Sequence, residues 1–124
     1  MRQTVVAVVD DDSGMRRALK NLLKTHGFVV ELHASAADFI ESATLTKASC
    51  LVTDIQLKDL SGIEMCRRLR DSGFSMPVVF MTASLSRAIR ARAMEFGCAA
   101  YLTKPFPAQA LLDAIENASR EAET

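Results

Sequence analysis

The stretch LVTDIQLKDLSG, residues 51–62, decides the fold of this chain. Its short apolar run ends in the carboxylate of Asp54, and after a polar loop Ser61 and Glu64 form a capping box that opens a helix. Strand, acid, loop and helix in this order are typical of an α/β sheet that presents a reactive group at the carboxyl end of a strand. An Asp at a strand end is also common as an ordinary loop or cap residue, so the other strand ends have to decide its role.

Apolar runs on either side of this stretch predict further strands. They are separated by segments whose apolar residues recur at helical spacing. The predicted strands are residues 5–9, 28–32, 50–53, 78–81 and 99–103. The predicted helices begin near Ser13, Ser35, Ser61, Ser84 and Pro107. Because strands and helices alternate with short connections, the sequence predicts an α/β domain with a parallel sheet covered on both faces.

Composition limits the class of protein. With 124 residues the chain suits one domain with a single core. Fifteen basic side chains balance fifteen acidic ones, and no apolar run approaches the roughly 20 residues of a membrane span, so neither nucleic acid nor membrane is an expected partner. The three widely spaced cysteines argue against a disulfide framework or a zinc site. We expect one cytoplasmic domain over residues 1–124, with no output domain in this chain.

The carboxyl ends of the predicted strands carry the residues that could perform chemistry. Parallel strands place these ends along one edge of the sheet, where ligands bind. The residues found there are Asp10, Asp11, Asp12, Asp54, Thr82 and Lys104. Each one alone has an ordinary explanation, such as a solvated helix cap or a surface lysine. Apolar packing requires none of them, however, so their convergence is the main functional evidence in the sequence.

The acidic residues predict a metal ion. Two carboxylates about 4 Å apart repel by roughly 4 kcal/mol at an effective dielectric near 20. Asp11 and Asp54 could both stay ionised only with a cation between them; otherwise one must take up a proton. Mg²⁺ is the most suitable ion, and Mn²⁺ or Ca²⁺ could replace it. Asp54 could then act as nucleophile in a phosphoryl transfer, with Lys104 and the Thr82 hydroxyl on the phosphate oxygens.

Four motifs in this order resemble the response-regulator receiver domain of two-component signalling, over nearly the whole chain. VVDDDSGMRR resembles the first strand and acidic turn, VTDIQLKDLSG the phosphoacceptor loop, VVFMTAS the switch-hydroxyl strand and YLTKPF the lysine–proline turn. The resemblance implies a doubly wound (βα)5 domain of flavodoxin-like fold, whose five-stranded sheet has the order 2-1-3-4-5. It also implies a signalling switch that catalyses only its own phosphorylation and dephosphorylation.

The resemblance also assigns roles to the site residues. Asp54 would be the phosphoacceptor, and Thr82 and Lys104 would act on the phosphoryl group. The implied metal ligands are the carboxylates of Asp10, Asp11 and Asp54 and the backbone carbonyl of Gln56, with Asp10 acting partly through water.

Two positions near the site concern how the signal is passed on. The resemblance implies that Tyr101 rotates inward behind Thr82 and alters the face formed by the fourth helix, the fifth strand and the fifth helix. Tyr101 can equally be a packing residue of the sheet.

The loop after the acceptor departs from the family pattern. Most of the family has proline four residues after the acceptor, whereas this chain has Lys58, which predicts a basic and more flexible loop.

The implied partners are a cognate histidine kinase and either a downstream protein target or an attached DNA-binding output domain that regulates transcription. Phosphorylation could also drive homodimerisation. Two other functions are open at this stage. An Mg²⁺-dependent phosphohydrolase would need an acid at position 56, where this chain has Gln56. A receiver-like adaptor that signals without phosphate would not need the combination of acids, hydroxyl and lysine.

Overall fold

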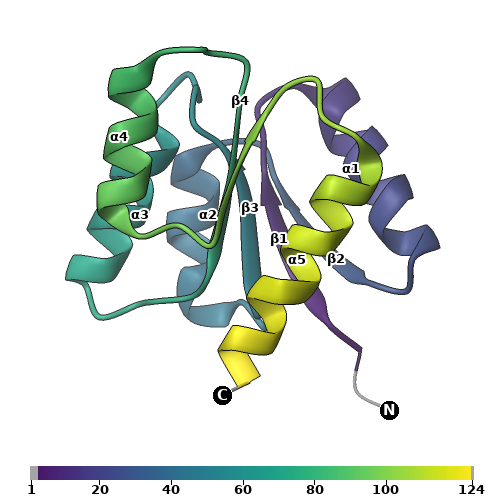
Figure 1. Ribbon diagram of the computed structural model, residues 1–124. Coiled ribbons are helices and arrows are strands. Elements are labelled where there is room, and N and C mark those ends of the chain that lie inside the picture. The colour runs from purple at the N-terminus through teal and green to yellow at the C-terminus, as the bar shows by residue number, and fades with distance from the viewer. Residues whose placement is uncertain (1–2, 124) are drawn as a thin grey trace.

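The computed structural model describes residues 3–123, and within them five strands form one parallel sheet (Figure 1). The strands are β1 (Val5–Val9), β2 (Val29–His33), β3 (Cys50–Asp54), β4 (Val78–Thr82) and β5 (Ala100–Thr103). Their order is β2-β1-β3-β4-β5, which confirms the predicted topology. The chain runs outward from β1 to β2 and then crosses to β3, so the strand order reverses at the β1–β3 pair. In an open α/β sheet, the carboxyl ends at such a reversal form a binding crevice.

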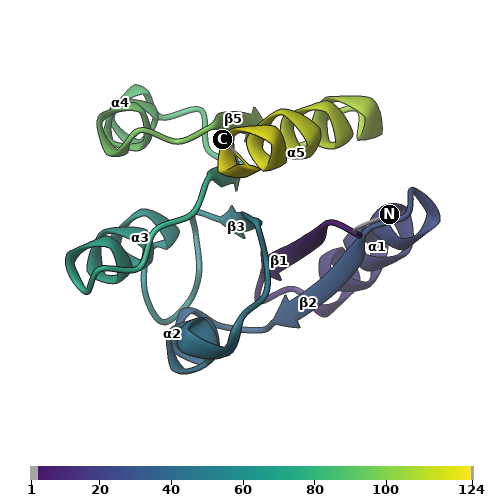
Figure 2. The ribbon, with the colours of Figure 1, turned by 90° about the horizontal axis from the view of Figure 1, so that it is seen from below.

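Helices cover both faces of the sheet, as the alternating pattern predicts. They are α1 (Ser13–Thr25), α2 (Ala36–Ser42), α3 (Gly62–Asp71), α4 (Arg87–Phe96) and α5 (Ala108–Glu123). In the view along the sheet, α1 and α5 lie on one face and α2, α3 and α4 on the other (Figure 2). No helix within residues 3–123 combines the length and the apolar character that crossing a bilayer would require.

The apolar core lies in two layers, one on each face of the sheet. Successive side chains of β1 alternate between them, so Val6 and Val8 pack with α1 and α5 while Ala7 and Val9 pack with α2 and α3. Every residue of β3 and β4 is buried. A strand covered on both faces needs apolar residues at nearly every position, and this explains the continuous runs in the sequence.

Several element boundaries differ from the sequence predictions, and the differences matter for the site. Helix α1 is capped by Asp12, whose Oδ1 accepts from the backbone N–H groups of Gly14 and Met15, whereas Ser13 was the expected cap. Strands β3 and β4 each extend one residue further than predicted, so Asp54 and Thr82 are the last residues of their strands. The hydrogen bonds between β3 and its neighbouring strands, including β4, therefore hold the backbones of Asp54 and Thr82 in place.

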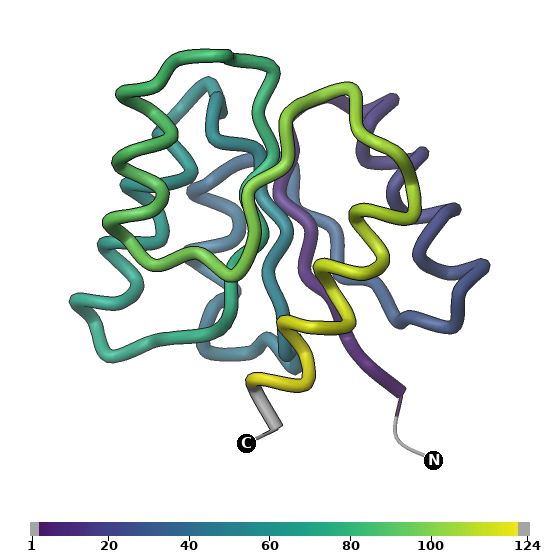
Figure 3. The backbone as a smooth tube through the Cα atoms, viewed as in Figure 1, coloured from purple at the N-terminus to yellow at the C-terminus, as the bar shows by residue number. Residues whose placement is uncertain are grey.

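The predicted fourth helix is shorter than expected. It begins at Arg87 rather than near Ser84, because the Ser86 side chain accepts from the backbone N–H of Ile89 and forms the N-cap. Residues 83–86 are therefore a loop. The tube in Figure 3 shows that this loop and those after β1, β3 and β5 lie together at one end of the molecule.

Candidate functional site

The carboxyl edge of the sheet brings together Asp10, Asp54 and Lys104. Nζ of Lys104 donates to Asp54 Oδ2 over 2.9 Å and to Asp10 Oδ2 over 3.3 Å. The three residues follow or end β1, β3 and β5, so the lysine side chain reaches past the end of β4 to meet both acids. Asp10 is fully buried and Asp54 is 8% exposed. An ion pair this deeply placed is costly unless each partner is satisfied by further hydrogen bonds.

Asp10 has two such further hydrogen bonds, one from a backbone N–H and one from a side chain. Its Oδ1 accepts from the backbone N–H of Asp12 over 2.9 Å, and its own carbonyl accepts from the Arg16 guanidinium over 2.7 Å. Burial raises the pKa of Asp10, and the nearby charge of Asp54 adds to the effect, while the Asp12 N–H and the Lys104 ammonium oppose it. Burial also favours the neutral form of Lys104, but the hydrogen bond to Asp54 and the charges of both acids outweigh it, so the pKa of Lys104 is raised. The lysine is therefore a fixed positive charge at neutral pH.

Asp54 is held by its own loop and by the start of α3. Its Oδ1 accepts from the backbone N–H of Gln56 over 3.0 Å, and the backbone N–H of Ile55 donates to the Met81 carbonyl over 2.9 Å. Helix α3 begins directly against this strand end, at Gly62. A Cβ atom at position 62 would lie 2.3 Å from the Asp54 carbonyl oxygen, so only glycine allows this approach.

Thr82 lies at the end of β4, beside β3, and its side chain is fully buried. Its hydroxyl donates to Oε1 of Gln56 over 2.7 Å and accepts from the backbone N–H of Ser84 over 3.0 Å. The side chain of Gln56 therefore holds the Thr82 hydroxyl, for which a bond to a phosphoryl group is predicted.

Asp11 points to the β3–α3 loop rather than into the ion-pair cluster. Its Oδ2 accepts from the backbone N–H of Lys58 over 2.8 Å. The next residue, Asp59, accepts from the backbone N–H groups of Ala36 and Ala37 at the start of α2. These bonds lower the pKa of Asp59. Lys58 predicts a more flexible loop than proline would give, and in this structure the loop is hydrogen-bonded to the turn after β1 and to the start of α2.

The donor set at this edge is chemically suited to Mg²⁺, because it consists of carboxylate and carbonyl oxygens. The predicted ligands Asp10, Asp11, Asp54 and Gln56 all lie at the carboxyl ends of β1 and β3. Within residues 3–123, however, no three His, Cys, Asp or Glu side chains are placed to hold a metal together. Each of the three carboxylates accepts hydrogen bonds from Lys104 or from backbone N–H groups instead.

Tyr101 lies on β5, away from the Lys104 cluster. Its half-buried ring packs against the core on the α4 side of the sheet, and the Arg90 guanidinium carbon lies 5.1 Å from the ring centroid. The Tyr101 hydroxyl is buried and has no hydrogen-bond partner among the described residues. The packing role is therefore visible in this structure, and the switch role stays a prediction.

Sequence reasoning missed two contacts that hold the site. The side chain of Gln56 binds Thr82, and the backbone N–H of Lys58 binds Asp11. A signal for the first was available, because β3 and β4 pair with Asp54 opposite Met81, and this register places the residues just after Asp54 near Thr82. The second depends on two loops meeting in space, and no pattern in the sequence reports that.

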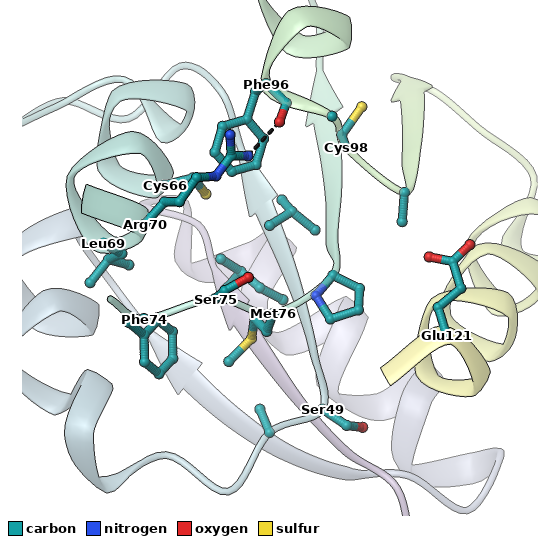
Figure 4. A pocket seen from close by; sticks show the side chains of 16 residues that line it. Ser49, Cys66, Leu69, Arg70, Phe74, Ser75, Met76, Phe96, Cys98 and Glu121 are labelled. Carbon is teal, nitrogen blue, oxygen red and sulfur yellow. Dashed lines mark hydrogen bonds between the residues drawn. The ribbon is translucent and has the colours of Figure 1, made fainter. Parts of the chain in front are cut away.

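A cavity of about 680 Å³ lies at the other end of the sheet, below α3 and α4 (Figure 4). None of the predicted site residues lines it. The Arg70 guanidinium crosses it from α3, stacks 3.6 Å from the centroid of the Phe96 ring and donates to the Phe96 carbonyl. Cys66 and Cys98 also line this cavity.

The three cysteines are free thiols with different burial. Burial raises the pKa of Cys50 and Cys66 to about 12. Cys98 is half-buried just before β5, and burial raises its pKa as well. The two buried thiols are apolar groups of the core.

Comparison with known proteins places the chain in a family. Residues 6–116 match the family described as the response regulator receiver domain. The chain is 34% identical over 119 residues to the transcriptional regulatory protein FixJ of Rhizobium meliloti, covering 96% of this chain and 58% of the relative. It is 37% identical over 113 residues to nodulation protein W of Bradyrhizobium diazoefficiens, covering 91% of this chain and 50% of that relative. The crystal structure of FixJ-N has a TM-score of 0.90 at 33% identity, covering 97% of this chain and 96% of that one.

The chain spans about half the length of the curated relatives it matches. The full-length FixJ structure from B. japonicum aligns with a TM-score of 0.91 at 32% identity, over 99% of this chain and 61% of that one. Response regulator receiver domains are signalling proteins rather than classical enzymes. The chain is a receiver domain of a two-component response regulator, homologous to FixJ, and it belongs to the response regulator receiver domain family.

Proposed function

We propose that the chain is a phosphorylation-dependent switch in which Asp54 accepts a phosphoryl group from a phosphohistidine of a partner kinase. The observation that carries this proposal is the cluster at the carboxyl edge, where Asp54 meets Lys104 and Asp10. In the transfer, a carboxylate oxygen of Asp54 bonds to phosphorus while the bond from phosphorus to the histidine nitrogen breaks. The product is an aspartyl phosphate on the chain and a histidine on the kinase.

The site residues divide the work of this transfer. Asp10, Asp11, Asp54 and the backbone carbonyl of Gln56 would hold Mg²⁺, which neutralises charge on the incoming phosphoryl group. Lys104 already lies 2.9 Å from Asp54 and would stay with a phosphate oxygen as an ion pair.

Thr82 would leave the side chain of Gln56 and donate to another phosphate oxygen. This exchange links the chemistry to the β4–α4 loop, since the backbone N–H of Ser84 donates to the same hydroxyl. The face formed by α4, β5 and α5, with Tyr101 on β5, would then report the phosphorylated state.

The length of the relatives supports a proposal about the output of the switch. Curated relatives named as transcriptional regulatory proteins are nearly twice as long as the matched region, which supports residues 1–124 as the receiver unit of such a regulator. We infer that the phosphorylated chain acts on a DNA-binding output domain or on a separate protein target in the cytoplasm. Homodimerisation on phosphorylation is one way in which it could pass the signal on.

Intact-mass measurement tests the proposal. After incubation with acetyl phosphate and Mg²⁺, the chain is expected to gain one phosphoryl mass, and EDTA or the substitution Asp54→Asn should abolish the gain. Asp113→Asn, at an exposed carboxylate on α5, is the matched control and should be phosphorylated like the wild type.

The same experiment separates the two rival functions. A wild-type chain that gains no mass would favour the adaptor that signals without phosphate. Rapid multiple turnover of p-nitrophenyl phosphate would favour a phosphohydrolase, although Gln56 cannot protonate a leaving group.

A further inference from the structure

The hydrogen bond between Lys58 and Asp11 joins two loops that flank the site. The backbone N–H of Lys58 donates to Asp11 Oδ2 over 2.8 Å, across 47 positions of sequence. Proline at position 58 could not make this bond, because proline has no backbone N–H. The bond is therefore a consequence of having lysine, or any residue other than proline, at this position.

We propose that the Lys58 N–H is an internal competitor of the metal ion for the Asp11 carboxylate. The bond turns Asp11 toward the β3–α3 loop, and Mg²⁺ has to displace Lys58 before Asp11 can become a ligand. Lys58 is thus a positioning residue that sets the metal affinity of the site. This inference rests on the proposed function, in which Asp11 is one of the ligands.

Neighbouring contacts oppose a movement of the loop together with Asp11. On the other side of Lys58, both carboxylate oxygens of Asp59 accept from the backbone N–H groups of Ala36 and Ala37, over 3.2 and 2.9 Å. The loop is therefore held to α2, and a carboxylate that turns toward Asp54 has to leave the Lys58 N–H behind. This agrees with the finding that no three acidic side chains within residues 3–123 are placed to hold a metal together.

The expected effect is large enough to measure. A hydrogen bond to a charged group is stronger than one between neutral groups, and the freed N–H of Lys58 can bind water because the bond is exposed. The low end of the usual strength of such bonds corresponds to about tenfold in affinity. Removing the N–H should therefore tighten Mg²⁺ binding by about tenfold.

Direct titration of the metal into the unphosphorylated chain tests the proposal without any activity assay. Lys58→Ala removes the side-chain charge but keeps the N–H, and Lys58→Pro removes both. We expect calorimetry or NMR to show that Lys58→Pro binds Mg²⁺ about tenfold more tightly than Lys58→Ala. Equal affinities of the two variants, or weaker binding by Lys58→Pro, would overturn the proposal.

The wild-type chain gives a second readout that does not depend on the folding of a variant. Hydrogen exchange of the Lys58 amide should be slow without metal and fast at saturating Mg²⁺. An amide that stays protected with Mg²⁺ bound overturns the inference, while phosphorylation of Asp54 in the same sample would leave the proposed function standing. A wild-type chain that binds no Mg²⁺ and gains no phosphoryl mass would overturn both.

Discussion

Asp10 is fully buried, so keeping its carboxylate ionised lowers the free energy of unfolding. Its pKa is raised, mainly by burial, so the folded state binds the Asp10 proton more tightly than the unfolded chain does. An acid whose pKa is higher in the folded chain contributes most to the free energy of unfolding below its unfolded pKa of about 3.9. This contribution is lost as the pH rises through the pKa of the folded chain. At neutral pH the buried carboxylate of Asp10 therefore lowers stability, which is the behaviour expected if it is one of the metal ligands in the proposed function.

The substitution Asp10→Asn should therefore stabilise the chain at neutral pH. Asparagine can still accept from the Asp12 N–H but carries no buried charge, so we expect the free energy of unfolding at pH 7 to rise by about 1 kcal/mol. The gain should shrink at pH 4, where wild-type Asp10 takes up its proton. Urea unfolding at both pH values measures this, and Asp113→Asn on the exposed side of α5 should change the free energy by less than about 0.5 kcal/mol. A less stable Asp10→Asn at pH 7 would mean that the pairing with Lys104 outweighs the cost of burial.

The junction between β3 and α3 is the element that sets the position of Asp54. Helix α3 can begin against the strand end only because position 62 has no side chain. At Gly14, near the start of α1, an added Cβ would meet only the flexible Asp12 side chain, at 3.3 Å. The two glycines therefore form a matched pair near the starts of two helices.

We expect Gly62→Ala to destabilise the fold by about 3 kcal/mol, because the backbone at the end of β3 has to move. Gly14→Ala should change stability by no more than about 1 kcal/mol, with a gain expected from helix propensity. Thermal or urea unfolding of the two variants and the wild type measures these changes in stability. The Gly62→Ala chain should also accept phosphate from acetyl phosphate more slowly, since Asp54 is displaced. Equal stabilities of the two variants would show that the junction adapts to a methyl group.

The elements themselves could be predicted from the sequence, but their ends and their loops could not. The parallel sheet and its covering helices follow from continuous apolar runs and short connections, because a strand buried on both faces leaves little choice of residues. The strand order was predicted from the resemblance to receiver domains and is confirmed. The cap of α1 could not be chosen in advance, since Asp12 and Ser13 are both good caps. The Lys58–Asp11 bond was unpredictable for a different reason, because it joins loops that are distant in sequence and are brought together only by the finished sheet.

For the molecule as a whole, binding of Mg²⁺ at one edge should raise global stability. A ligand that binds only the folded state at ten times its dissociation constant adds about 1.4 kcal/mol to the free energy of unfolding. We expect urea unfolding of the wild type to shift by this amount with Mg²⁺. Asp11→Asn should show a much smaller shift, and NaCl of matched ionic strength should not replace the metal. A stabilisation by Mg²⁺ that persists in Asp11→Asn would remove Asp11 from the set of ligands.

The unequal burial of the three thiols has a practical consequence for following the proposed switch in solution. Thiol-reactive dyes attack through the thiolate, and Cys50 and Cys66, which are buried and have pKa values of about 12, supply almost none at neutral pH. Cys98 is the thiol that a maleimide fluorophore can reach in the folded chain. The native sequence thus already provides a single labelling position just before β5, where a dye can be attached without engineering and read out in real time.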